Sequence, residues 1–212
     1  MARPDRPKGG PAPRIAAVVL AAGRSTRAGA TNKLLAPIDG IPMVARAVAR
    51  IKGSGASPII VVTGHQSAAV RAALAALADS AVTFAHNPDF AQGMAGSIGA
   101  GIEALPGDVA GALICLGDMP AIEAAEIDRL IEAFDAHGGA AICVPKAGRR
   151  RGNPVLFARR FFPELLALEG DNGAKTVIAA HAESLAEIPM AGTGTLVDLD
   201  TVEQIAGFSS SD

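Results

Sequence analysis

Short, uninterrupted apolar segments alternate with segments of helical periodicity along much of the chain. The apolar segments span residues 15–20, 59–63, 82–86, 112–116 and 140–144. The segments between them carry apolar residues at the spacing of one helix face, and they span residues 43–51, 68–77, 96–105 and 124–134. Strands that are apolar at every position are typical of parallel sheets with both faces covered. The alternation therefore predicts an α/β fold of three layers, with a mostly parallel sheet between two layers of helices.

The pattern changes after residue 145. A polar segment at 148–154 precedes a short apolar one at 155–157, which predicts a hairpin or an excursion from the main sheet. Beyond it, the sequence predicts two short helices at 161–168 and 174–180, strand-like pieces at 184–188 and 195–199, and a last helix. We expect residues 1–13, which are basic and rich in proline, to form a flexible tail, and residues 14–208 to form a single domain.

The composition argues against several classes of protein. The net charge is −2 and only 3% of the residues are aromatic, which gives no support for a nucleic-acid or anionic-membrane surface. No apolar run approaches the ~20 residues of a membrane span. Cys115 and Cys143 each lie inside an apolar run, as buried free thiols do. We expect a cytoplasmic protein with no nucleic-acid or membrane partner.

A loop of small and cationic residues follows the first apolar segment directly. Arg24, Arg27 and Lys33 lie in residues 21–33, and no acidic residue is among them. Small residues let backbone N–H groups approach a ligand, and the three cations match the oxygens of a triphosphate. A solvated turn is the alternative interpretation.

A second candidate site is the lone aspartate Asp118, which follows the apolar segment at 112–116. Ligands of parallel sheets gather outside the carboxyl ends of the strands, which is where both loops would lie. Magnesium bound to a nucleotide uses one or two protein carboxylates, so Asp118 is a candidate ligand, with Asp198 or Asp200 as the second. Alternatively, Asp118 caps the helix that follows it, and Asp200 caps the last helix.

Two further segments carry weaker signals. Residues 87–97 enter a helix and either hold a base or sugar or simply turn the chain. Residues 149–151 and 170–175 either receive an anionic acceptor or form a solvated surface. A Walker phosphate loop is excluded because the sequence has no Gly-Lys pair, and neither a nucleophile elbow nor a zinc-ligand spacing is present.

These segments resemble the nucleotidyltransferases of the MobA-like group, in particular the molybdenum cofactor cytidylyltransferases. The matching segments occur in family order over about residues 14–208, and they are 20–27, 32–35, 117–120, 152–157, 170–175 and 198–201. The sequence departs from the family at Ala28, where methionine is usual, at Lys175, where arginine is usual, and at Gln204, where an acidic residue is usual. Lys175 cannot form the bidentate phosphate fork of an arginine.

The resemblance implies a Rossmann-like domain of the nucleotide-diphospho-sugar transferase type. It implies transfer of CMP from CTP to the phosphate of molybdopterin with release of pyrophosphate, dependent on Mg²⁺. The guanylyl-transferring branch usually has glycine at the position of Ala22, so alanine favours cytidine. A client molybdoenzyme and a monomeric or weakly dimeric state are further expectations. A guanylyltransferase, a sugar-phosphate nucleotidyltransferase and a nucleotide-binding chaperone without catalysis are the alternatives.

The expected roles divide the site residues into four groups. The catalytic residues are Arg24, Arg27, Lys33 and Asp118. The nucleotide would also contact Leu20, Ala21, Ala22, Gly23, Ser25, Gly64, Gly93 and Ser97. The acceptor, within residues 146–195, would contact Arg151, Asn153 and Lys175. The metal ligands would be Asp118 with Asp198 or Asp200.

Overall fold

The computed structural model describes residues 12–24, 32–134, 141–199 and 202–208. Of the expected site residues, Ser25, Arg27 and Asp200 lie outside these ranges, as does most of the expected N-terminal tail. None of the helices in the described ranges is long and apolar enough to span a bilayer.

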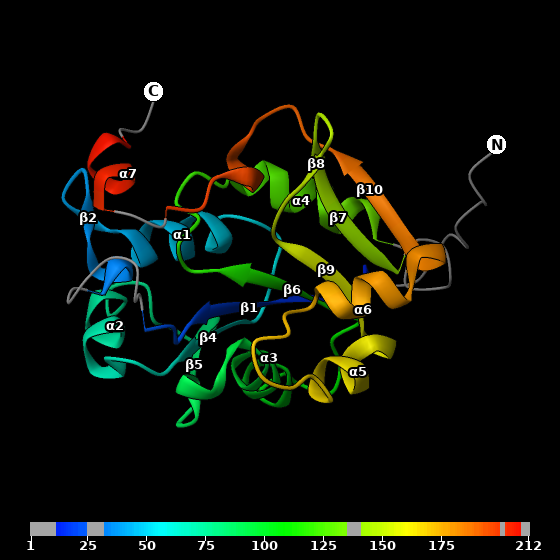
Figure 1. Cartoon of the computed structure of the whole chain (residues 1–212), viewed down its shortest axis with the longest axis horizontal. Helices are drawn as coiled ribbons and strands as arrows, with labels where there is room; N and C mark the ends of the chain where they lie inside the picture. Colours follow the sequence, from blue (N-terminus) through cyan, green and yellow to red (C-terminus); the bar gives the residue numbers. More distant parts are fainter. Residues whose placement is uncertain (1–11, 25–31, 135–140, 200–201, 209–212) are drawn as a thin grey trace.

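The centre of the fold is one sheet of eight strands (Figure 1). Seven of them run across the sheet in the order β10-β7-β9-β6-β1-β4-β5, and β8 pairs with β7. In chain order they are β1 (Ile15–Ala21), β4 (Ile59–Thr63), β5 (Val82–His86), β6 (Gly111–Leu116), β7 (Ile142–Ala147), β8 (Arg150–Arg151), β9 (Val155–Ala158) and β10 (Leu185–Pro189). A separate two-stranded ribbon joins β2 (Pro37–Ile38) and β3 (Ile41–Pro42).

The sheet is mostly parallel, as predicted. β1 lies between β6 and β4 and pairs with both in parallel, while β10 pairs in parallel with β7. β9 is reversed: it is antiparallel to both β6 and β7. The predicted hairpin exists as β7 and β8, but the following segment is a strand within the main sheet rather than an excursion from it. Because β9 runs backwards, Asn153, which precedes it, lies at the edge where β6 ends.

Helices cover both faces of the sheet, which confirms the three-layer architecture (Figure 1). α3 (Met94–Glu103) and α5 (Phe162–Leu166) pack together on one face, and α3 lies against β1 and β4. α1 (Met43–Lys52) and α4 (Ala124–Ala133) pack together on the other face, against β1 and β7. The remaining α-helices among the described residues are α2 (Ser67–Ala73), α6 (Lys175–Ala180) and α7 (Val202–Gly207).

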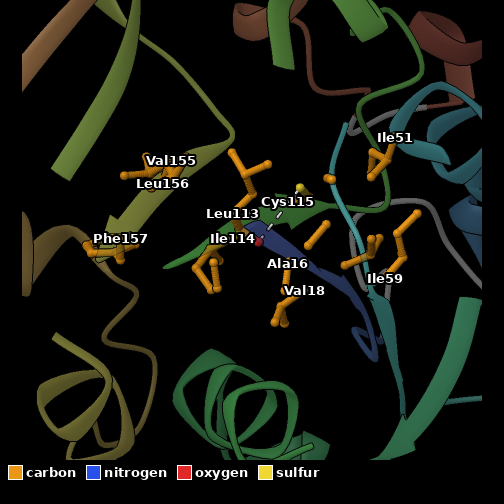
Figure 2. Packing of buried hydrophobic residues seen from close by; sticks show 14 of the residues in the cluster. Ala16, Val18, Ile51, Ile59, Leu113, Ile114, Cys115, Val155, Leu156 and Phe157 are labelled. Atoms are coloured by element: carbon orange, nitrogen blue, oxygen red, sulfur yellow. Dashed lines mark hydrogen bonds between the residues drawn. The ribbon is translucent and has the colours of Figure 1, made fainter. Parts of the chain in front are cut away.

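The core is formed where β1, β6 and β9 lie side by side (Figure 2). Val18 of β1 and Leu113 of β6 are fully buried, which explains why these strands are apolar at every position. A Cβ at Gly101 of α3 would lie 2.2 Å from a methyl group of Val18, so a glycine there lets the helix approach β1 closely. Cys115 and Cys143 are buried free thiols, and burial raises the pKa of the Cys115 thiol.

The predicted strand at 195–199 is wrong. Residues Gly194–Leu196 form a 3-10 turn, called η6, and no strand follows it before residue 200. The backbone bonds of this segment go to loops instead: Asn153 N donates to Thr195 O at 2.9 Å, and Leu199 N donates to Asp118 O at 3.2 Å. A segment held in this way has no neighbouring strand with which to pair.

Candidate functional site

A cleft of about 740 Å³ opens at the carboxyl end of β1 and β6. This is the edge at which open α/β sheets bind their ligands. Residues from the ends of β1 and β6, the start of α3, the start of β9 and the segment before α6 line it. Those from the sheet ends and nearby loops are Leu20, Ala22, Gly23, Arg24, Lys33, Leu34, Ile114, Leu116, Asp118, Asn153, Val155 and Asp198. Those from the helical side are Phe90, Ala91, Gly93, Met94, Ser97, Ile98, Asp171, Gly173, Ala174, Lys175 and Ile178.

Lys33 and Asp118 meet at the centre of this edge. The Nζ of Lys33 lies 2.6 Å from Oδ2 of Asp118, and their side chains are only 13% and 18% exposed. Lys33 begins the 3-10 helix Lys33–Leu35, whose first turn is fixed because the Asn32 side chain accepts from Leu34 N at 3.1 Å. Asp118 follows β6. The pairing of β6 with β1 continues one residue past the strand, because Gly117 N donates to Leu20 O at 3.0 Å. The fold therefore places one cation and one carboxylate in contact in the lining of the cleft.

Asp118 does not cap the following helix. α4 begins after Glu123, and Glu123 and Glu126 form a reciprocal capping box there. The capping alternative for Asp118 is thus excluded. Burial raises the pKa of Glu126.

The carboxylate of Asp118 retains capacity to bind a ligand. Its Oδ1 is buried and has no hydrogen-bond partner in the described part of the chain. A buried acceptor of this kind is costly unless a ligand satisfies it. The exposed Asp198 lines the same cleft. No group of three metal-ligating side chains occurs among the described residues. Two carboxylates do fit a magnesium ion that takes its other ligands from phosphate and water.

The loop after β1 forms the wall beside this pair. Ala22, Gly23 and Arg24 line the cleft, whereas Ala21 is fully buried and does not. Gly64 also lies outside the lining. A Cβ at Gly64 would lie 2.6 Å from Cβ of Phe90 and 2.9 Å from Cβ of Ala22, so this glycine lets two lining residues pack over it.

The start of α3 forms the opposite wall. Gly93 lines the cleft with a φ of 125°, and a Cβ there would lie 2.2 Å from the carbonyl oxygen of Gly170. Ala95 N donates to that same oxygen at 3.1 Å. The Ser97 hydroxyl accepts from Nδ2 of Asn87 at 3.0 Å. These contacts fix the N-terminus of α3 against the segment that leads to Lys175.

A second cavity of about 470 Å³ adjoins the cleft. Five residues line both: Asn153, Val155, Lys175, Ile178 and Asp198. Of the three expected acceptor residues, Asn153 and Lys175 therefore lie at the junction, and Arg151 lines only the smaller cavity.

Glu187 of β10 holds Arg151 in place. Its Oε1 lies 2.8 Å from Nε of Arg151, and it also pairs with Lys146. The two cations, Lys146 foremost, lower the pKa of Glu187. Phe90 and Met94 lie in the segment 87–97, which the sequence offered as a holder of a base or sugar, and both line the cleft. Sequence reasoning missed Glu187, since nothing in the sequence shows which loop it approaches.

Comparison with known proteins identifies the family. The sequence profile of the MobA-like NTP transferase domain matches residues 17–185. The chain belongs to this family. It is therefore a nucleotidyltransferase of the MobA-like type.

The MobA-like chain is similar to curated proteins of at least two kinds. It is 28% identical over 197 residues to a molybdenum cofactor guanylyltransferase of Cupriavidus pinatubonensis, covering 90% of this chain and 94% of the relative. It is 37% identical over 132 residues to the bifunctional protein GlmU of Kineococcus radiotolerans, covering 61% of this chain. The match spans only 26% of GlmU.

Solved structures confirm the fold class. Rv0371c of Mycobacterium tuberculosis superposes with a TM-score of 0.79 at 28% identity, covering 92% of this chain and 97% of that one. A nucleotidyl transferase of Methanothermobacter superposes with a TM-score of 0.77 at 24% identity, covering 91% and 94%. Rv0371c has also been solved in complex with manganese, with a TM-score of 0.70 at 26% identity, covering 86% and 90%.

Proposed function

We propose that this MobA-like transferase transfers CMP from CTP to the phosphate of molybdopterin and releases pyrophosphate. The observation that carries the proposal is the Lys33–Asp118 pair, with its spare buried oxygen, in the lining of a cleft that adjoins a second cavity. Ligand cavities of about 300–1,000 Å³ bury one small molecule, so two adjoining cavities suit two substrates. The molybdenum cofactor guanylyltransferase, matched over nearly its whole length, supports a molybdopterin acceptor.

The reaction requires positioning and charge stabilisation rather than a protein nucleophile. An oxygen of the acceptor phosphate attacks the α-phosphorus of CTP in line, and the bond from the α-phosphorus to the bridging oxygen breaks. Pyrophosphate leaves with that electron pair. Arg24 and Lys33 would hold the phosphates and stabilise the leaving group, helped by Arg27, which lies outside the described residues.

Asp118 and Asp198 would hold a magnesium ion, with Asp200 as the alternative second ligand beyond the described residues. When bound, the ion would supply neutralisation of phosphate charge and alignment of the two substrates. The manganese complex of Rv0371c supports a divalent ion in this fold. Asn153 and Lys175 would direct the acceptor from the second cavity toward the nucleotide.

Within this proposal, Ala22 is the residue that determines the preference for CTP over GTP. It lines the cleft at the position where the guanylyl-transferring branch usually has glycine, so its methyl group would leave less room there for a base. A pyrimidine needs less room than a purine. The guanylyltransferase relative makes GTP the alternative that the experiment must address.

The test uses the purified full chain with Mg²⁺, molybdopterin and each of the four nucleoside triphosphates. Pyrophosphate release and the mass of the product are measured. We expect pyrophosphate and a cytosine dinucleotide product with CTP. Binding of CTP without pyrophosphate release would favour a chaperone without catalysis. Transfer to a sugar phosphate but not to molybdopterin would contradict the acceptor assignment.

Ala22→Gly tests the base preference, and Ala21→Gly is its matched control because Ala21 does not line the cleft. We expect Ala22→Gly to lower the ratio of kcat/KM for CTP over GTP by about tenfold, since one methyl group in a pocket contributes about 1–3 kcal/mol. Ala21→Gly should leave the ratio unchanged. A wild-type protein that prefers GTP would reject the cytidylyl assignment. The client molybdoenzyme, the oligomeric state and the cytoplasmic location stay predictions.

A further inference from the structure

The ion pair between Lys33 and Asp118 occupies one of the carboxylates that the proposed function assigns to the metal. Nζ of Lys33 lies 2.6 Å from Oδ2 of Asp118, and both side chains are largely shielded from water. Burial on this scale makes the contact less screened than a surface ion pair. The carboxylate is therefore held by an internal cation before any substrate arrives.

A divalent ion bound to Asp118 would compete with the Lys33 ammonium for the negative charge of the Asp118 carboxylate. Magnesium binds carboxylate oxygens at about 2.0–2.1 Å, so an ion on Oδ2 would lie within about 5 Å of Nζ if Lys33 stayed in place, and an ion on the unpartnered Oδ1 would share the same carboxylate with Lys33. Two cations at that separation in a poorly hydrated site repel one another. Coordination of the metal by Asp118 therefore favours movement of the lysine away from it.

A triphosphate offers Lys33 another partner. Lys33 lines the same cleft as Arg24, which is where the proposed function places the phosphates. A lysine ammonium on a flexible stem can leave one anion for another and bonds phosphate oxygens as a point charge. The nucleotide would thus draw Lys33 from Asp118 and add phosphate oxygens to the metal.

From this geometry, and resting on the proposed function, we infer that Lys33 is an exchangeable placeholder for the metal on Asp118. The nucleotide-free protein binds divalent ions weakly, and a nucleoside triphosphate releases Asp118 by taking up Lys33. Metal and nucleotide then bind with positive coupling, which by linkage acts equally on both affinities.

The decisive experiment measures Mn²⁺ affinity in the absence of nucleotide, by the electron paramagnetic resonance signal of free Mn²⁺. Lys33→Met removes the placeholder charge and keeps the length of the side chain. Lys175→Met is the matched control, because Lys175 lines the same cleft but forms no ion pair with Asp118 in the described part of the chain. We expect Lys33→Met to bind Mn²⁺ about tenfold or more tightly than the wild type. Lys175→Met should change the affinity by less than about threefold.

A second measurement addresses the coupling. Binding of a CTP analogue with a methylene group between the α- and β-phosphorus is compared in Mn²⁺ and in EDTA. Mn²⁺ should tighten analogue binding by a larger factor in the wild type than in Lys33→Met. Formation of the metal–nucleotide complex in solution is common to both proteins, so it cancels in this comparison.

The outcomes separate the placeholder from the proposed function. If the Lys33→Met and Lys175→Met variants bind Mn²⁺ equally, or if Lys33→Met binds it no more tightly than the wild type, the placeholder is rejected even where CMP transfer is observed. If the placeholder result is obtained but no nucleotide yields pyrophosphate, the proposed function fails instead. Should Lys33→Met not fold, Lys33→Gln makes the same comparison.

Discussion

Gly93→Ala should destabilise the protein strongly because Gly93 lies where two walls of the cleft touch. Its φ of 125° and ψ of −178° belong to a region that only glycine occupies readily, and other residues there cost about 1–3 kcal/mol. A Cβ would also lie 2.2 Å from the Gly170 carbonyl oxygen. Relieving that overlap would break the hydrogen bond from Ala95 N to the same oxygen, a loss of about 0.5–1.5 kcal/mol. The sum is about 2–4 kcal/mol.

For a domain of this size, 1 kcal/mol lowers Tm by about 2–4 °C, so Gly93→Ala should melt about 5–15 °C below the wild type. Gly99→Ala is the matched control. Gly99 lies inside the same helix with nothing within 4 Å of a Cβ, so alanine there should stabilise by about 0.5–1 kcal/mol. Urea and thermal unfolding, followed by far-ultraviolet circular dichroism, measure both. Equal stability of the two variants would refute the close contact between Gly93 and Gly170.

Two other predictions concern charge. Asp118→Asn should lower the rate of CMP transfer by about 10²–10³-fold at saturating substrates while the protein stays folded, because it removes a full charge from the proposed metal site. Pyrophosphate release measures this rate. If Asp198→Asn lowers the rate as much as Asp118→Asn does, Asp118 is not the main metal ligand. Nε2 of His181 lies 2.8 Å from the Glu164 carboxylate, and this hydrogen bond raises the pKa of His181. The pair therefore stabilises the folded protein fully below the ordinary histidine pKa, and this contribution is lost as the pH rises through the raised pKa. His181→Gln should therefore lower Tm more at pH 6 than at pH 9, and an equal loss at both would contradict the charged pair.

Most of the sheet could be predicted from the sequence because its strands are buried on both faces. The segment 15–20 is apolar throughout since β1 lies between two other strands, and α3 and α1 cover its faces. Helix limits were less well predicted: α3 begins at Met94, two residues before the expected start. Its start is fixed by the remote Gly170 carbonyl, which local periodicity does not reveal.

Long-range pairing explains what the sequence could not show. The apolar residues 155–157 are typical of a strand but do not show its neighbours, so the insertion of β9 between β6 and β7 was missed. The alternating residues 195–199 resemble a strand, yet their backbone groups bond Asn153 and Asp118. By contrast, the edge shared by Lys33 and Asp118 followed from strand order alone, because both loops follow parallel neighbours.

Because β9 is antiparallel to its neighbours, insertions before it and after it would emerge on opposite sides of the domain. Residues added between β8 and β9 would emerge beside the smaller cavity, because Gly152 and Asn153 of that connection line it. Residues added after Ala158 would emerge on the far side of the domain, next to the start of β6 at Gly111. This one short connection, which lines the smaller cavity, can therefore change in length while the ends of β1 and β6 stay as they are.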